Sequence, residues 1–188
     1  MFFKKKPQPP KIGGYIGYYN LGDWWRNTLD EAERQEILER FRPLGGDGDD
    51  LIDNQILSTD RHRVQFLYEL ASWFTRSDRV SLGLKILQEA EAGLESAPLI
   101  VQHFYYSTYI ELRYKQRKED PSAIDDVKQI CYRSMTIAPK VAAEFLKLYP
   151  NQDLPRHVCF NQLIVLLKKE GNSEELGRVE QEYGRAWS

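Results

Sequence analysis

The sequence contains little cysteine, little net charge and no long apolar run, and each shortage excludes a class of protein. Its two cysteines, Cys131 and Cys159, among 188 residues are too few for the disulfide framework of a small secreted domain. The formal net charge of −2 excludes a protein whose whole surface binds polyanions. The longest apolar run, residues 163–167, is far shorter than the roughly 20 residues that a membrane-spanning helix needs. We therefore expect a soluble, cytoplasmic protein that does not insert into a membrane.

Aromatic residues, in contrast, are abundant. They make up 12% of the chain, with 11 Tyr, 8 Phe and 4 Trp, which excludes a disordered chain. Seven of the 12 glycines precede residue 50, so we expect the first quarter to be irregular. We divide the chain into a basic, proline-rich tail (1–13), an aromatic, glycine-rich cap with one acidic helix and an acidic loop (14–57), and a helical-repeat region (58–188).

Apolar residues recur at helical rather than alternating spacing, which predicts an all-α fold. A capping box of Thr28 and Glu31 predicts a helix to about residue 41, and we expect Thr59 to cap the next helix. Prolines are interpreted as helix boundaries, so Pro139 is expected to separate a helix ending near residue 138 from a short helix over 140–149. Further helices are expected over 78–95, over 98–118, and as a pair divided at Gly171.

One stretch carries the spacing of a known repeat. Its first helix has Leu67, Leu70, Ala71 and Phe74 at the pattern positions, and its second helix has Gly83, Leu87 and Ala90. This stretch resembles a tetratricopeptide repeat, in which small residues let two antiparallel helices approach closely. Two weaker units follow around Cys131 and Leu163, where Arg113 and Glu180 depart from the pattern. The resemblance implies an α-solenoid of about three stacked antiparallel helical hairpins over residues 64–187.

The aromatic segment over 14–25 carries a second resemblance. Together with the acidic helix after it, His103-Phe104, and Leu154-Pro155-Arg156-His157, it resembles a family of uncharacterised bacterial helical-repeat proteins. That resemblance implies no particular activity. The segment has two interpretations: an exposed recognition patch of Tyr and Trp, or a structural cap in which Trp24, Trp25 and Tyr18 cover the first helical hairpin.

The repeat resemblance also implies a binding surface, because the first helices of stacked tetratricopeptide hairpins line a concave groove. In this register the groove faces carry Gln65, Tyr68, Ser72, Arg76, Ser107, Tyr114, Arg117, Lys118, Asn161, Lys168 and Lys169. The candidate partner-binding residues are Tyr68, Arg76, Tyr114, Arg117, Lys118, Asn161, Lys168 and Lys169. Arginine and lysine cations, an asparagine amide and tyrosine rings are side chains that bind the carboxylates of an acidic peptide. Alternatively, these residues form the hydrated faces of amphipathic helices, and the two lysines at 168 and 169 also fit the usual basic end of a helix.

No motif indicates a metal, a cofactor or a catalytic centre. The acidic loop fails as a calcium loop, because counting from Asp47 places Leu51 and Ile52 at the fifth and sixth positions. His157 and Cys159 lack the usual spacing of metal ligands, and no glycine-rich phosphate loop is present. We therefore predict no metal, no cofactor and no catalytic residue.

The sequence as a whole predicts a non-catalytic scaffold for protein–protein recognition, with an acidic peptide segment in the basic, aromatic groove. One alternative is an accessory protein that binds nucleic acid or an anionic surface through Lys4, Lys5, Lys6 and the groove cations, with a steep salt dependence. We do not expect nucleic acid to be the main partner.

Two further alternatives concern catalysis and self-association. An enzyme of unknown class would require carboxylates, or His62, His103 and His157, to converge in a pocket. A homo-oligomer would cover the apolar face that an incomplete terminal repeat leaves open, and Trp187 stands where such a cap would be.

Overall fold

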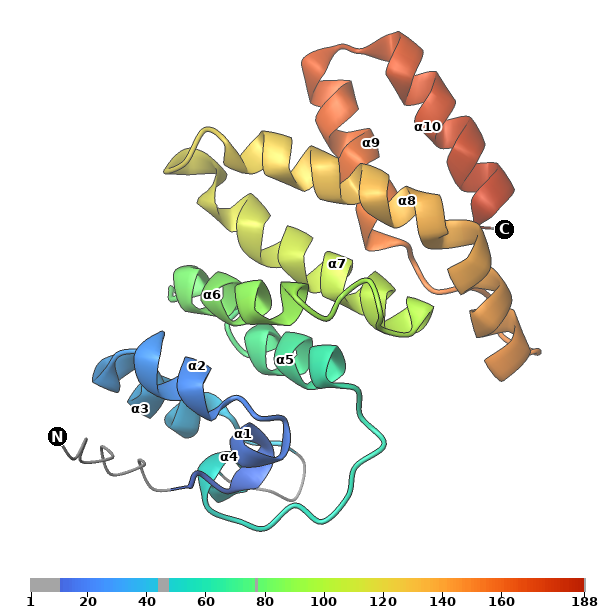
Figure 1. Cartoon of the computed structure of the whole chain (residues 1–188). Helices are drawn as coiled ribbons and strands as arrows, with labels where there is room; N and C mark the ends of the chain where they lie inside the picture. Colours follow the sequence, from blue (N-terminus) through green and yellow to red (C-terminus); the bar gives the residue numbers. More distant parts are fainter. Residues whose placement is uncertain (1–10, 44–47, 77, 188) are drawn as a thin grey trace, which may run out of the picture. The chain divides into compact units, whose positions relative to one another are not determined.

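The computed structural model of the chain describes residues 11–43, 48–76 and 78–187. Lys4, Lys5 and Lys6 of the predicted tail, and Asp47 of the acidic loop, lie outside these residues. Within the described ranges the regular structure is helical and no strand occurs, which confirms the predicted all-α class (Figure 1). No helix there has both the length and the apolar character needed to span a membrane.

The chain forms two compact units, Met1–Asp60 (unit 1) and Arg61–Ser188 (unit 2). Unit 1 contains α1 (Gly14–Tyr18), α2 (Gly22–Asn27), α3 (Glu31–Arg40) and α4 (Asp49–Ile52). Trp24 and Trp25 of α2 are buried, whereas Tyr18 at the end of α1 is 40% exposed. The aromatic segment therefore supplies both core residues and surface residues.

Gly14 allows α1 to contact α4. Its φ is +55°, a conformation that costs glycine least, and a Cβ at this position would overlap the backbone of Leu51. The amides of Gly13 and Gly14 donate to the carbonyl oxygens of Ile52 and Asn54 at 2.8 and 2.6 Å. These contacts hold the two short helices together.

The capping box of α3 lies two residues later than predicted. Asp30 Oδ1 accepts a hydrogen bond from the Glu33 amide at 2.8 Å, and Glu33 Oε2 accepts one from the Asp30 amide at 2.9 Å. The Thr28 amide instead donates to the Trp24 carbonyl oxygen, so Thr28 ends α2. The prediction of Thr28 and Glu31 as the box is wrong, because the same spacing also fits Asp30 and Glu33.

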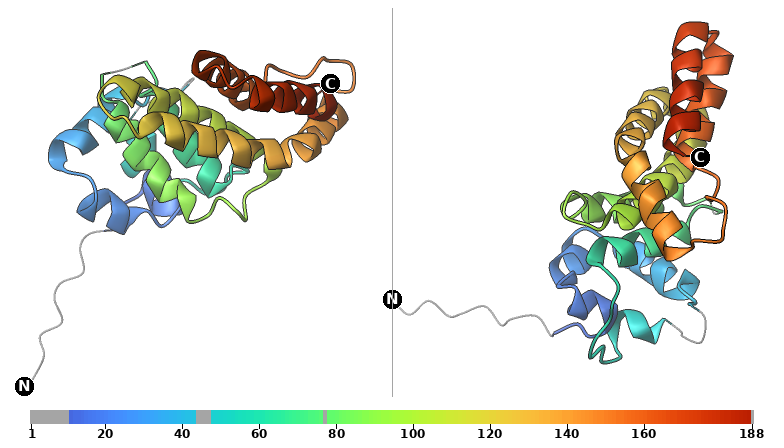
Figure 2. Two further views of the ribbon diagram at one scale, coloured as in Figure 1. Left: turned by 90° about the horizontal axis from the view of Figure 1, so that it is seen from above. Right: turned by 90° about the vertical axis from the view of Figure 1, so that its right-hand side faces the viewer.

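Unit 2 contains α5 (Arg63–Ser72), α6 (Val80–Glu91), α7 (Leu99–Arg113), the 3-10 helix η1 (Tyr114–Lys118), α8 (Ala123–Leu148), α9 (Val158–Glu170) and α10 (Ser173–Ala186). Helix α5 packs on α6, α7 on α8, and α9 on α10. The first helices of these pairs are also in contact, α5 with α7 and α7 with α9. Figures 1 and 2 show the helices of this unit following one another in chain order, with α9 and α10 side by side.

Of two helix boundaries predicted in unit 2, the structure contradicts one and confirms the other. Helix α5 is capped by His62, whose Nδ1 accepts from the Val64 amide at 3.2 Å, so the prediction of Thr59 as the cap is wrong. The division of the last pair at Gly171 is confirmed. Gly171 ends α9 with φ +70°, and Asn172 Oδ1 caps α10 by accepting from the Glu175 amide.

The boundary predicted at Pro139 is wrong, because α8 continues through this residue. On both sides of it buried residues recur at steps of three and four: Cys131, Ser134, Ala138, Val141 and Phe145. Burial of this continuous stripe offsets the backbone hydrogen bond that proline removes. Helix α8 bends along its length (Figure 1), as helices that contain proline commonly do.

The interior of unit 2 contains a close helix contact and both thiols. A Cβ at Gly83 of α6 would lie 2.9 Å from Leu112 Cδ2 and 3.0 Å from Phe74 Cβ, so α6 approaches both neighbours at a residue without a side chain. Cys131 of α8 and Cys159 of α9 are free and buried. Burial raises the pKa of both thiols, which keeps them protonated at neutral pH.

Candidate functional site

A pocket of about 550 Å³ opens at the end of α7, and we call it the basic pocket. Its lining residues are Thr75, Arg76, Ile110, Glu111, Tyr114, Lys115, Arg117, Val158 and Gln162. They come from the turn after α5, the last turn of α7, η1 and the start of α9. All of these elements belong to unit 2.

The basic pocket has an excess of positive charge. Arg76, Lys115 and Arg117 line it, opposed by the single carboxylate of Glu111. Lys115 donates to the carbonyl oxygen of Thr75, which ties η1 to the turn after α5. The Arg76 and Arg117 side chains are exposed and form no ion pair with any described residue.

Tyr114 orients Arg117. The guanidinium carbon of Arg117 lies 4.2 Å from the centre of the Tyr114 ring, within the range of a cation–π contact. Its Nη1 also donates to the Tyr114 carbonyl oxygen at 2.9 Å. A guanidinium carries five N–H groups, so Arg117 keeps donors beyond this hydrogen bond for an anion.

Arg113 fixes the turn that holds η1. Its side chain is 12% exposed, and its Nη2 donates to Asp120 at 2.6 Å and to Asp126 at 2.7 Å. It also donates to Gln116 at 2.6 Å and to Ser122 at 2.8 Å. The hydrogen bond from Arg113 lowers the pKa of the Asp120 carboxyl. One guanidinium therefore joins the end of α7, η1 and the start of α8.

Three of the residues predicted for the groove meet in this pocket: Arg76, Tyr114 and Arg117. Lys169 lies near it, since its Nζ donates to Tyr114 Oη at 3.4 Å. Lys118 is an exposed residue of η1 but does not line the pocket.

The other predicted groove residues lie elsewhere in unit 2. The Tyr68 ring is 6.1 Å from the ring of Phe104, which precedes Glu111 of the basic pocket by seven residues on α7. Asn161 donates to the His157 carbonyl oxygen at 2.7 Å, beside the N-terminus of α9. Lys168 forms an ion pair with Glu180 at 3.1 Å.

Gln65, Ser72 and Ser107, assigned to the same faces, form local hydrogen bonds. Gln65 donates to Glu69 at 2.9 Å and Ser72 Oγ to the Glu69 carbonyl oxygen at 2.6 Å. Ser107 is buried, and its hydroxyl donates to the His103 carbonyl oxygen at 3.0 Å.

Sequence reasoning missed Glu111 and Lys115, which line the basic pocket. Glu111 follows Phe104 by seven residues on α7, so the helical spacing of exposed residues was a usable signal. Lys115 lies in η1, where the helix tightens to about three residues per turn. That change of period rotates the following side chains and carries no clear signal in the sequence.

A second, smaller pocket of about 230 Å³ lies beside Phe104 of α7, and we call it the aromatic pocket. Its lining residues are Phe104, Phe145, Tyr149, Gln152, Asp153, Leu154 and Pro155. They come from α7, the last turns of α8 and the loop that leads to α9. The extension of α8 past Pro139 thus builds one wall.

A buried aromatic cluster supports this second pocket. The rings of His103 and His157 are 4.8 Å apart, and Trp187 lies 5.3 Å from the first and 4.5 Å from the second. Burial lowers the pKa of His103 to about 4. Burial and the neighbouring His103 lower the pKa of His157 to about 3. Both imidazoles are therefore neutral at pH 7.

The three histidines do not meet in one pocket. His103 and His157 are together but buried among rings, and His62 caps α5. Trp187 is buried in the same cluster. Within the described part of the chain, no group of three or more His, Cys, Asp and Glu side chains is placed to hold a metal ion.

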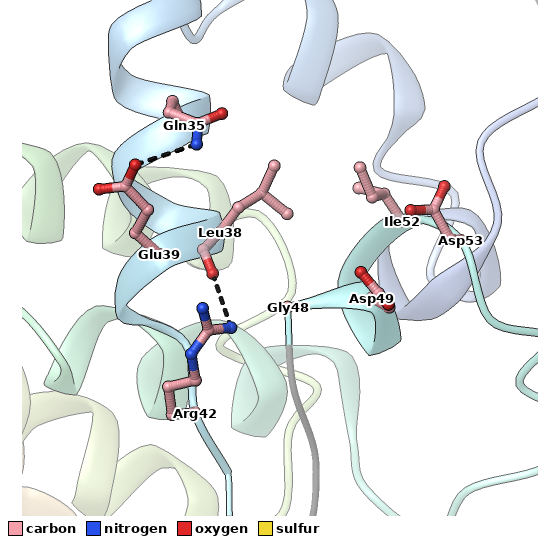
Figure 3. A pocket seen from close by; sticks show the side chains of 8 residues that line it. All are labelled: Gln35, Leu38, Glu39, Arg42, Gly48, Asp49, Ile52 and Asp53. Carbon is pink, nitrogen blue, oxygen red and sulfur yellow. Dashed lines mark hydrogen bonds between the residues drawn. The ribbon is translucent and has the colours of Figure 1, made fainter.

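Unit 1 has a pocket of its own, of about 350 Å³, between α3 and α4 (Figure 3). The carboxylates of Glu39, Asp49 and Asp53 line it, together with Arg42. Arg42 Nη1 donates to the Leu38 carbonyl oxygen at 3.2 Å, and the dashed lines in Figure 3 mark this bond and the one from Gln35 to Glu39. We assign this pocket no function.

Comparison with protein-family models, with curated proteins and with solved structures gives no match to this chain.

Proposed function

We propose that this protein is a non-catalytic scaffold of tetratricopeptide-like hairpins that binds an acidic peptide segment of a partner protein in the basic pocket. The observation that carries the proposal is the pairing of Arg76 and Arg117, two exposed guanidinium groups without an ion-pair partner among the described residues, in one pocket. Guanidinium forks bind carboxylates in a bidentate manner.

The arrangement of the helices supports the proposal. Helix α5 packs on α6, α7 on α8 and α9 on α10, and α7 contacts both α5 and α9, which is compatible with stacked hairpins. The basic pocket takes its lining from elements at the ends of the first helices of these pairs. An extended peptide in this pocket would cross the three first helices α5, α7 and α9.

The order of Arg117 favours recognition. Its contact with the Tyr114 ring and its hydrogen bond to the Tyr114 carbonyl oxygen restrict the side chain before a ligand arrives. A restricted side chain loses less conformational entropy on binding. The Tyr114 ring also provides apolar contact area beside the charge.

The test is the binding of a fluorescein-labelled peptide that carries four aspartates, measured by fluorescence anisotropy. We expect the Arg76→Glu, Arg117→Glu double variant to bind at least tenfold more weakly than the wild-type protein. The matched control is Lys140→Glu, Arg185→Glu, which reverses two exposed cations of unit 2 outside the pocket and changes the net charge equally. A peptide with asparagine at all four positions should not bind.

Two results would overturn the proposal. Equal weakening by both double variants would mean that only overall charge matters. Tighter binding of a single-stranded RNA oligonucleotide, with an affinity that falls steeply as salt rises, would support the nucleic-acid alternative instead.

A further inference from the structure

We propose that the two pockets on α7 bind one extended peptide together, with its acidic residues in the basic pocket and an apolar side chain in the aromatic pocket. This inference rests on the proposed function and adds the sequence pattern of the ligand. The pattern is an acidic pair with a leucine-like or aromatic residue three to five positions away.

Both pockets take lining residues from α7, Phe104 in the aromatic pocket and Glu111 in the basic pocket. Tyr68 of α5 does not line the aromatic pocket, but it packs beside Phe104 of α7 with ring centres 6.1 Å apart. At the basic pocket, Thr75 after α5 lines the same space as Glu111 of α7. Each step, from Tyr68 to Thr75 and from Phe104 to Glu111, is seven residues in the same chain direction. Helices α5 and α7 therefore run parallel, and α7 connects the pockets.

The separation of the pockets fixes the spacing of the ligand. Seven residues of helix advance about 10 Å along the axis, and an extended peptide covers that distance in about three residues. The reach of side chains into each pocket widens the range to about three to five residues. Phe104 and Glu111 are seven residues apart and therefore lie on the same face of α7, and the two residues between them on this face, Ser107 and Thr108, are small and buried.

The two pockets differ in charge, which sets the direction of the ligand. The basic pocket has three cations and one carboxylate. The charged side chain that lines the aromatic pocket is Asp153, among phenyl rings, Leu154 and Pro155. An acidic residue is therefore favoured at one end and repelled at the other, so a peptide shifted by several residues loses affinity.

The experiment compares four labelled peptides of equal length in a serine and glycine background, binding to the full chain. One carries only an aspartate pair, and the others add one leucine at one, four or nine positions from the pair. We expect the four-residue spacing to bind about tenfold or more tightly than the pair alone, because burial of one leucine side chain has that effect on a dissociation constant. The one- and nine-residue spacings should bind like the pair alone.

Two variants locate the effect. Tyr149→Ser removes an exposed wall of the aromatic pocket, and it should abolish the advantage of the leucine while leaving the affinity for the aspartate pair unchanged. Asp153→Asn should increase the affinity for a peptide whose leucine is followed by an extra aspartate. Arg117→Glu should weaken all four peptides.

The outcomes separate the two proposals. If the aspartate pair binds and depends on Arg117, but leucine at every spacing adds the same affinity or none, the bipartite pattern is wrong and the proposed function stands. If the aspartate pair does not bind, the proposed function is wrong. If the four-residue advantage persists in Tyr149→Ser, the apolar side chain binds outside the aromatic pocket.

Discussion

Trp187 donates its indole N–H to the carbonyl oxygen of Pro155 at 2.7 Å, and so joins the end of α10 to the loop that lines the aromatic pocket. The same indole stacks on the His103 ring at an interplanar angle of 19°. One side chain thus supports the pocket through both a hydrogen bond and ring contacts. The packing of α10 and the shape of the aromatic pocket depend on each other through this residue.

Replacing Trp187 with phenylalanine removes the donor while keeping a ring. We expect the free energy of unfolding to fall by about 1–2 kcal/mol, because the Pro155 carbonyl oxygen loses its partner. Trp187→Ala should cost about 3–5 kcal/mol through the lost ring volume. Urea denaturation followed by circular dichroism measures both, and a smaller effect of alanine than of phenylalanine would contradict this account.

Stability should fall as the pH drops below about 6.5. In the unfolded chain a histidine has a pKa of about 6.5, whereas in the fold the pKa of His103 is about 4 and that of His157 about 3. Between these values the unfolded chain takes up protons that the folded chain does not. Stability is therefore fully present above pH 6.5 and decreases on acidification, by about 1 kcal/mol per histidine and pH unit.

Urea denaturation at pH 7.5, 6.5 and 5.5 measures this slope. His103→Phe should retain the fold, since Nδ1 of His103 has no hydrogen-bond partner and its ring contacts include Phe145 and Trp187. The variant should show about half the wild-type loss over this range. An unchanged slope would mean that other groups cause the acid sensitivity.

Arg113 should affect binding without touching the ligand. Arg113→Ala removes the hydrogen bonds to Asp120, Asp126 and Ser122 that hold the turn after η1. We expect faster amide hydrogen exchange over residues 114–120 and a several-fold loss of affinity for the aspartate peptide, because Tyr114 and Arg117 lose their fixed position. Protection that stays the same while affinity falls would indicate direct contact between Arg113 and the peptide.

Two effects of a Gly83→Ala change on stability, crowding by the new Cβ and the higher helix propensity of alanine, can be separated. Gly83→Ala should lower the free energy of unfolding by about 1–2 kcal/mol, because its Cβ would crowd Phe74 and Leu112. Gly177→Ala in α10 is the matched control, since nothing lies within 4 Å of a Cβ there. It should raise the stability by about 0.5–1 kcal/mol. Equal effects of the two changes would show that α6 has room to adjust.

Local signals in the sequence predicted the helical class and several helix ends. Gly171 and Asn172 are short-range stop and start signals, and the structure uses both. Pro139 is also a local signal, but its interpretation as a boundary failed because buried residues continue at helical spacing on both sides. The spacing from Ala138 to Val141 and Phe145 was readable in the sequence, and it outweighs the single proline.

The candidate site was partly predictable for the same reason. Arg76, Tyr114 and Arg117 were found through the register of the repeat, which is a local pattern. The aromatic pocket was not, because Phe104 meets Tyr149 and Leu154 only through the bend of α8 and the loop after it. Contacts between residues far apart in the chain leave no periodic signal in a single sequence.

Both thiols of the chain lie within unit 2, buried in α8 and α9. A thiol-reactive dye therefore modifies the folded protein slowly, because burial keeps the thiols protonated and inaccessible. Unit 1 contributes no cysteine. The rate of labelling in increasing urea consequently reports the opening of unit 2 alone, without any engineered probe.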